Sequence, residues 1–266
     1  MFDIEIYLNS LSENIEEIDV SRKDITDLNV TRFKKLKILH CEYNKLSSLH
    51  LNENLEELYC SNNQLTFLHL NEKLKNLYCS NNQLTSLHLE KLQILSCCDN
   101  KLSSLHLNEN LKNLSCSYNQ LTSLHLNENL KYLYCNHNQL TSLHLNENLQ
   151  RLYCNNNQLT SLHLNKNLQY LSCYNNRLTS LYLNKKLLEL FCSNNPISET
   201  IGDSQINLRV LNQFKYLYYC LKFKKRLRDL LWVKIREPKI RIKYSHDYLV
   251  KNLHEDTDLD ELLANW

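Results

Sequence analysis

The sequence predicts a parallel β-sheet solenoid with a C-terminal α-helical segment. Cysteines recur every 19 residues along most of the 266-residue chain, with a single 18-residue step from Cys79 to Cys97. Each lies in the same pattern, L-x-x-L-x-C-x-x-N-x-L followed by L-x-L, and nine good copies extend from Leu36 to Ile197. A fixed period of this length indicates a stack of equivalent turns. After Asp203 the apolar residues change to helical spacing.

Alternation along each predicted strand separates core from surface. In one copy, Leu58 and Cys60 share a face. Because Leu58 belongs to the apolar pattern, we expect each cysteine of the file to be a small buried hydrophobe. Val20, at the equivalent place in a degenerate first copy, cannot bind metal and supports this interpretation. The cysteines of the file are Cys41, Cys60, Cys79, Cys97, Cys116, Cys135, Cys154, Cys173 and Cys192.

A redox or metal-binding role for these thiols is the less favoured alternative. A zinc site needs four ligands that converge tetrahedrally, whereas these thiols follow one line, so no metal site is predicted. Cys98 falls on the outward-facing parity and is the best candidate for a reactive thiol.

Asparagine is expected to replace glycine in the turns. The chain has one glycine, Gly202, and asparagine tolerates left-handed backbone. The asparagine three residues after each cysteine is expected to bond the backbone of both neighbouring turns and form a ladder. This file consists of Asn44, Asn63, Asn82, Asn100, Asn119, Asn138, Asn157, Asn176 and Asn195.

The L-x-L element adds a row of histidines on the convex side. A 19-residue turn is too short for a convex helix, so this side should be extended or form short 3₁₀ turns. A solvated surface row is the favoured interpretation, and chelation of a divalent ion in pairs or joint titration near pH 6 are the alternatives. The row consists of His50, His69, His88, His106, His125, His144 and His163, followed by Tyr182.

Strand residues that point away from the core form the predicted binding surface, on the concave side. They are rich in tyrosine, serine and asparagine, a mixture that serves protein recognition, and tyrosine and arginine are enriched at interface hot spots. We expect a protein partner here; the alternative is that the tyrosines only cover the sheet. The predicted partner-binding residues are Tyr59, Tyr78, Tyr132, Tyr134, Arg151, Tyr153, Tyr170 and Tyr174.

Other classes of function have little support in the sequence. It contains no evident paired carboxylates, nucleophile–base set or glycine-rich phosphate loop, so we expect no enzyme, no cofactor and no small-molecule substrate. The net charge of +2 suggests neither a nucleic-acid nor a membrane partner. The first residues, MFDIEIYLNSLSENIEEIDV, resemble no secretory signal, so an intracellular protein with reduced thiols is expected.

Three regions follow from these patterns. Residues 1–35 are predicted to be an N-terminal cap with a degenerate repeat, residues 36–197 the repeats, and residues 198–266 a helical cap or tail. Asp203 or Ser204 is expected to cap a basic helix that ends at Pro238. In an alternative function the chain is an adaptor whose basic tail recruits ubiquitylation machinery or nucleic acid, although a solvated basic face is favoured.

The repeated pattern is similar to the signature of leucine-rich repeat proteins, with cysteine at a position usually held by leucine. The ending, from Lys243 and Tyr244 to the acidic stretch before Asn265 and Trp266, resembles the C-terminal segment of proteins from giant amoeba-infecting viruses of the mimivirus group. The resemblance implies a viral product that acts in the host cytoplasm or nucleus on a host or viral protein.

Overall fold

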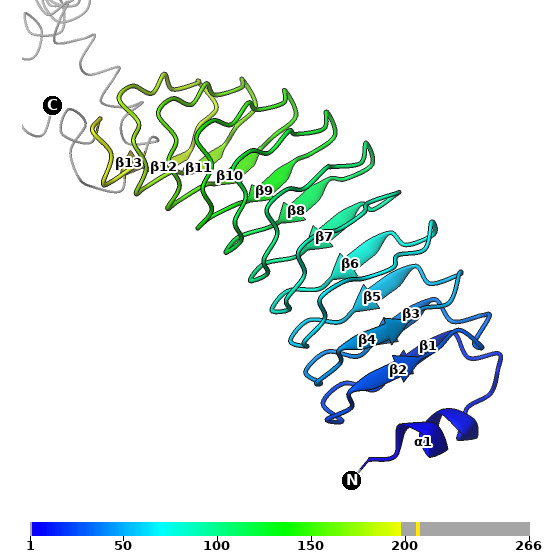
Figure 1. Cartoon of the computed structure of the whole chain (residues 1–266). Coiled ribbons are helices and arrows are strands. Elements are labelled where there is room, and N and C mark those ends of the chain that lie inside the picture. The colour runs from blue at the N-terminus through cyan, green and yellow to red at the C-terminus, as the bar shows by residue number, and fades with distance from the viewer. Residues whose placement is uncertain (1, 198–205, 208–266) are drawn as a thin grey trace, which may run out of the picture. The chain divides into compact units, whose positions relative to one another are not determined.

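A stack of short strands makes up most of the part of the chain that the structure, a computed structural model, describes: residues 2–197 and 206–207 (Figure 1). One helix, α1 (Ile4–Ser10), precedes the strands. Ten parallel strands of three residues and the final strand β13 form the main sheet in the order β1-β3-β5-β6-β7-β8-β9-β10-β11-β12-β13. Their bounds are β1 (Glu17–Asp19), β3 (Ile38–His40), β5 (Glu57–Tyr59), β6 (Asn76–Tyr78), β7 (Ile94–Ser96), β8 (Asn113–Ser115), β9 (Tyr132–Tyr134), β10 (Arg151–Tyr153), β11 (Tyr170–Ser172), β12 (Glu189–Phe191) and β13 (Ile206–Asn207).

The strand register follows the sequence repeat. Leu58 pairs with Leu77 and Leu77 with Leu95, so the alignment holds even across the 18-residue turn. Beyond each strand the ladder continues, as where the Cys60 amide donates to the Tyr78 carbonyl at 2.8 Å. The predicted parallel-sheet solenoid is therefore confirmed.

Leucine and cysteine side chains fill the interior. Leu58, Cys60, Leu65 and their equivalents are fully buried in one continuous core. The second leucine of each L-x-L element, such as Leu70, is only partly buried against that core. The boundary between core and surface thus lies within the convex segment.

The convex side is extended, one of the two conformations expected. Strand β2 (Asp27–Asn29) pairs in parallel with β4 (Ser48–His50), and a single bridge joins His163 to Tyr182. Other convex segments run without regular pairing, and the described residues contain no 3₁₀ helix. The predicted histidine row is exposed along this side.

The N-terminal end is covered by α1. Asp3 caps this helix because its Oδ1 accepts from the amides of Glu5 and Ile6, both at 3.1 Å. Leu8 of α1 is buried in the core. The degenerate copy forms a true turn, since Ile18 and Val20 are buried as their later equivalents are.

The start of the C-terminal segment differs from the predicted helix. Ile206 and Asn207, two residues after the expected cap Ser204, form β13, which pairs antiparallel with β12. Pairing satisfies the backbone groups that β12 would otherwise present at the sheet edge. The expected basic helix and the tail motif lie outside the described residues.

Left-handed residues make the turns, but they are not all asparagines. The residue before each ladder asparagine has φ between 51° and 58°, and it is asparagine in five of the nine repeats. In the others it is Tyr43, Asp99, Tyr118 or His137. Left-handed backbone costs such residues energy, which the surrounding hydrogen bonds must offset.

The asparagine file supplies many of these bonds. Asn82 Nδ2 donates to the carbonyls of Cys60 in the previous turn and Cys79 in its own, at 3.0 and 3.1 Å, while its Oδ1 accepts from the Leu65 amide at 3.0 Å. The same pattern recurs through the file. Asn63 is half-buried, whereas its equivalents are buried.

A second asparagine ladder lies in the link after the L-x-L element. Asn146 and Asn165 each donate from Nδ2 to the carbonyl of the equivalent asparagine one turn earlier and to a core leucine carbonyl. This ladder was not predicted, although an asparagine recurs directly after L-x-L in most turns. Other members of this ladder are Asn52, Asn71, Asn127 and Asn184.

The 18-residue turn interrupts the second ladder. Glu90 directly follows Leu89, where most other turns have asparagine. Asn108, one turn later, consequently has a buried Nδ2 without a hydrogen-bond partner in the described part of the chain. A buried unpaired amide costs about 1–3 kcal/mol.

Insertion of asparagine between Leu89 and Glu90 is expected to stabilise the protein. The insertion recreates the LNEKL segment of Leu70–Leu74 and gives Asn108 Nδ2 the acceptors that Asn127 has. We expect the free energy of unfolding to rise by about 1–3 kcal/mol, measured by urea titration. The same insertion in an Asn108→Ala background is the control and should stabilise the protein less; an equal gain in both backgrounds would contradict the ladder explanation.

Candidate functional site

The cysteine file is buried and chemically protected. Each of its nine side chains is at most 2% exposed, and the described cysteines from Cys41 to Cys173 are free thiols. Burial raises the pKa of Cys60 well above its usual value and that of Cys135 to about 12, because the interior disfavours a thiolate. At neutral pH these thiols are therefore neutral packing groups.

Cys98 does not have the features of a reactive thiol. It is half-buried, and burial raises its pKa above the usual value, with Asp99 acting in the same direction. Hydrogen bonds involving Ser117 and Ser80 oppose this shift without reversing it. Strand parity alone predicted an exposed, reactive thiol at Cys98, whereas the side chain is half-buried on the outer face.

Predicted site residues on the early strands form an aromatic stack. The rings of Tyr59 and Tyr78 lie 4.7 Å apart and nearly parallel, and His40 stacks on Tyr59 at 4.4 Å. The Tyr59 hydroxyl donates to Glu57 Oε2 at 3.0 Å. Burial and this carboxylate raise the pKa of Tyr59 to about 12. The participation of His40 was not predicted.

Carboxylates surround this stack. His40 lies 3.6 Å from Glu17 and 3.8 Å from Glu42, and Glu42 Oε2 is buried without a hydrogen-bond partner among the described residues. We call Glu17, Asp19, Glu42 and Glu57 the acidic end of the main-sheet face. A hydrogen bond from the Ser21 side chain lowers the pKa of Asp19, which favours its charged form.

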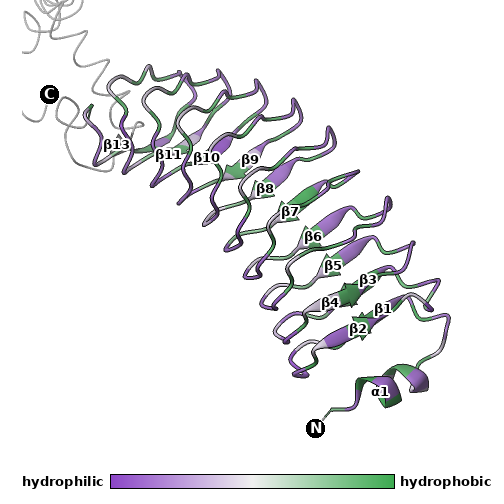
Figure 2. Ribbon diagram, viewed as in Figure 1, coloured by the Kyte–Doolittle hydropathy of each residue, from purple (hydrophilic) through white to green (hydrophobic). Residues whose placement is uncertain are grey.

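The middle of the face is small and largely uncharged. The hydroxyls of Ser80 and Ser96 are 3.0 Å apart, and other outward positions there hold asparagine, serine or Ile94. Figure 2 shows how hydropathy varies along the sheet, with β7 mostly hydrophobic and β10 hydrophilic. An uncharged stretch thus separates two aromatic regions.

The second aromatic region is built around Arg151. Its guanidinium lies over the ring of Tyr170 at 4.5 Å and over that of Tyr132 at 5.8 Å. On the next outward position, Tyr134 and Tyr153 stack at 4.7 Å. We call these five residues the tyrosine–arginine patch. They come from the adjacent strands β9, β10 and β11.

The patch is half-buried and charged only at its centre. Its four tyrosines are partly exposed and Arg151 is exposed. Burial raises the pKa of Tyr153, with Tyr134 acting in the same direction and Arg151 opposing. Tyr174, also predicted as a site residue, is half-buried beyond the strand, where its amide donates to Asn155 Oδ1 at 3.1 Å. It makes no ring contact with the patch among the described residues.

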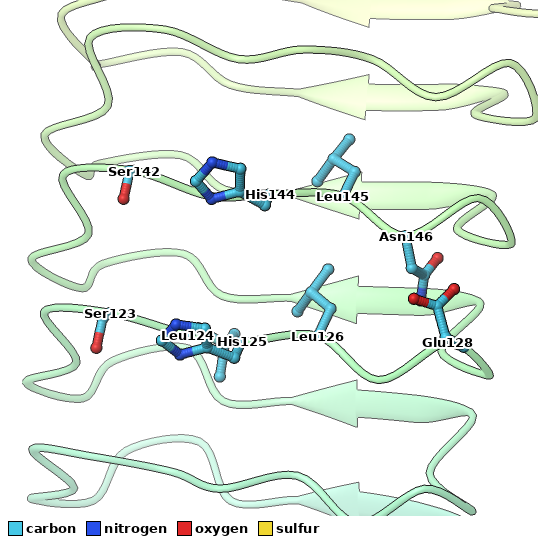
Figure 3. A pocket seen from close by; sticks show the side chains of 9 residues that line it. All are labelled: Ser123, Leu124, His125, Leu126, Glu128, Ser142, His144, Leu145 and Asn146. Atoms are coloured by element: carbon cyan, nitrogen blue, oxygen red, sulfur yellow. The ribbon is translucent and has the colours of Figure 1, made fainter.

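The convex side has a shallow pocket of about 230 Å³ between two turns. Figure 3 shows His125 and His144 on neighbouring turns, with Glu128 and Asn146 farther along the lining. The described residues contain no group of three or more histidine, cysteine, aspartate or glutamate side chains placed to hold a metal ion. The pocket is separate from both aromatic regions of the main sheet.

Membrane insertion through a helix has no support in the described residues. None of their helices has the length and apolar character needed to cross a bilayer.

These features define a leucine-rich repeat solenoid with cysteine and asparagine ladders. In solved structures, the functional domain of InlJ from Listeria monocytogenes, which includes a cysteine ladder, matches 71% of this chain with 32% identity and a TM-score of 0.66. YopM from Yersinia enterocolitica matches 70% with 29% identity and a TM-score of 0.57. The leucine-rich repeat protein LIC12759 of Leptospira interrogans shares the fold, with 24% identity over 73% of the chain and a TM-score of 0.56.

The matches cover only part of these proteins. The chain spans 47% of the InlJ chain, 48% of the YopM chain and 63% of the LIC12759 chain. No protein-family model matches the chain, and no curated protein is significantly similar to it. The comparisons therefore establish the leucine-rich repeat fold.

Proposed function

We propose that the chain is a non-catalytic binding module that holds a protein partner on its main-sheet face, centred on the tyrosine–arginine patch. The observation that carries this proposal is the arrangement of Arg151 between Tyr132 and Tyr170, beside the stacked pair Tyr134 and Tyr153. Rigid, half-exposed aromatic rings offer contact area at a small entropic cost. Solenoids also commonly use such extended surfaces for partners.

The proposed setting is intracellular. The described cysteines from Cys41 to Cys173 are free thiols, which suits a reducing compartment. A viral origin, with a host or viral protein as the partner, rests on the resemblance of the C-terminal ending alone.

Replacement of Tyr132, Tyr134, Tyr153 and Tyr170 by alanine is expected to remove partner binding. Loss of hot-spot residues usually costs 1 kcal/mol or more each, so recovery of crosslinked partners should fall about tenfold or further. The measurement is quantitative crosslinking and mass spectrometry with the full chain in host-cell extract.

A matched variant tests whether position matters. Tyr43, Tyr118 and Tyr182 are 51%, 51% and 80% exposed and do not lie on the main strands, so alanine at these three sites should leave recovery unchanged. Both variants must show the circular dichroism spectrum of the parent protein. Equal partner recovery by the patch variant and the parent would refute the proposed site.

A further inference from the structure

Charge is distributed unevenly along the main-sheet face. The acidic end places four carboxylates on β1, β3, β5 and the residues that follow them, with His40 as the one basic group on those outward positions. Nearby cations already have contacts, since Lys37 pairs with Glu16 and Arg22 lies over the Tyr43 ring. Glu42 Oε2 is buried without a hydrogen-bond partner among the described residues, so this carboxylate contributes negative charge to the acidic end.

Arg151 has the opposite character. The two tyrosine rings fix its guanidinium, yet it forms no ion pair or hydrogen bond within the described part of the chain. Glu189 occupies the same strand position on β12, but Tyr170 on β11 lies between them in the register. Five N–H donors in a fixed plane therefore remain for a partner, and carboxylates match that plane with two parallel bonds.

The sheet sets the distance between these two regions. Strands β5 and β10 are five steps apart in the strand order. Neighbouring strands lie about 4.8 Å apart, so the separation is about 24 Å, which an extended chain covers in about seven residues. Between the two aromatic regions, the outward positions of β7 and β8 carry no charge: they hold Ile94, Ser96, Asn113 and Ser115.

We infer that the partner contributes an extended segment that crosses the strands, with an acidic residue on Arg151 and a basic residue at the acidic end about seven residues away. This inference rests on the proposed function and specifies the chemistry of the partner. The aromatic stacks Tyr59–Tyr78 and Tyr134–Tyr153 contact apolar or aliphatic parts of the same segment. A nucleic acid does not fit, because the acidic end repels phosphates.

Selection of a random 12-residue peptide library on the full chain tests the inference. Enriched peptides are expected to contain one acidic and one basic residue six to eight positions apart. Synthetic peptides from the selection should bind Arg151→Glu at least about tenfold more weakly in fluorescence anisotropy. Reversing the peptide's acidic residue to lysine should restore binding to this variant. Arg177→Glu, at an exposed position off the strands, is the matched control and should bind as the parent does.

The outcomes separate the two proposals. Enriched peptides without the charge pair, whose binding is lost in the four-tyrosine variant, overturn the inference and leave the binding face in place. The extended-segment proposal is overturned if no peptide is enriched, or if peptide binding survives in both the Arg151→Glu variant and the four-tyrosine variant. The crosslinking experiment then decides the proposed function alone. Preferential binding of an RNA oligonucleotide that depends on Arg151 also overturns it.

Discussion

Raising the pH to about 10 is expected to unfold the solenoid. Burial raises the pKa of eight cysteines in the file above the usual value near 9, so these thiols stay neutral in the folded protein while they ionise in the unfolded chain. They are Cys41, Cys60, Cys79, Cys97, Cys116, Cys135, Cys154 and Cys173. The stabilising contribution of the neutral thiols is complete below pH 9 and is lost as the pH rises above it.

The expected loss is comparable with the whole stability of a typical domain. At one pH unit above the pKa of the unfolded chain, each thiol lowers the free energy of unfolding by about 1.4 kcal/mol. If the array unfolds as a unit, eight thiols together lower it by about 11 kcal/mol at pH 10. Native proteins are stable by about 5–15 kcal/mol. Circular dichroism between pH 7 and 11, at constant salt with a phosphine reductant, measures the transition.

Valine replacements distinguish the thiols from other alkaline titrations. Val20 already occupies the equivalent position of the first turn, fully buried, so valine at Cys116, Cys135, Cys154 and Cys173 preserves an apolar side chain there. With half of the eight thiols removed, the loss at pH 10 should fall to about 6 kcal/mol and the transition should shift to higher pH. An unchanged midpoint would assign the transition to tyrosine or lysine instead.

The periodic part of the fold was predictable because one rule repeats. Leu58 and Cys60 lie on the same side of a three-residue strand, and the alternation of a strand leaves no other arrangement once the leucines are interior. The double contact of each ladder asparagine follows equally from the need to satisfy backbone groups at a turn. Such inferences use only spacing and burial.

Features that depend on neighbouring side chains were harder to predict. Tyr118 and His137 take left-handed turns where asparagine was expected, and their rings stack at 4.1 Å, a contact invisible in either repeat alone. The orientation of Arg151 between two rings likewise depends on rotamers in three turns. Cys98 is half-buried, although strand parity predicted an exposed side chain. Residues 206–207 pair with β12 at the edge of the sheet, although the sequence predicted a helix there.

Replacement of Asn119 by alanine is expected to destabilise the repeats strongly. Its Nδ2 donates to the carbonyls of Cys97 at 2.9 Å and Cys116 at 3.1 Å, and its Oδ1 accepts from the Leu102 amide at 3.0 Å. Alanine leaves the Leu102 amide without its acceptor. It also removes one of the two ladder donors at each carbonyl, because Asn100 Nδ2 still donates to Cys97 and Asn138 Nδ2 to Cys116. Since an unsatisfied amide costs about 1–3 kcal/mol and each lost hydrogen bond about 0.5–1.5 kcal/mol, we expect a loss of about 2–5 kcal/mol in the free energy of unfolding.

Two further variants test the reason for this loss. Asn113→Ala removes an equally large amide from the outer face of the same turn, where its side chain makes no hydrogen bond to the described residues, and should change the free energy by less than about 0.5 kcal/mol. Asn119→Asp keeps an oxygen that accepts from the Leu102 amide, but its carboxylate faces the two carbonyl oxygens and repels them. Below its pKa the protonated acid can donate to only one of these carbonyls. Its stability relative to Asn119→Ala should therefore improve as the pH falls from 7 to 4. Urea titrations in which Asn119→Ala costs no more than Asn113→Ala would show that the ladder is incidental to stability, and that leucine and cysteine packing alone holds the turns together.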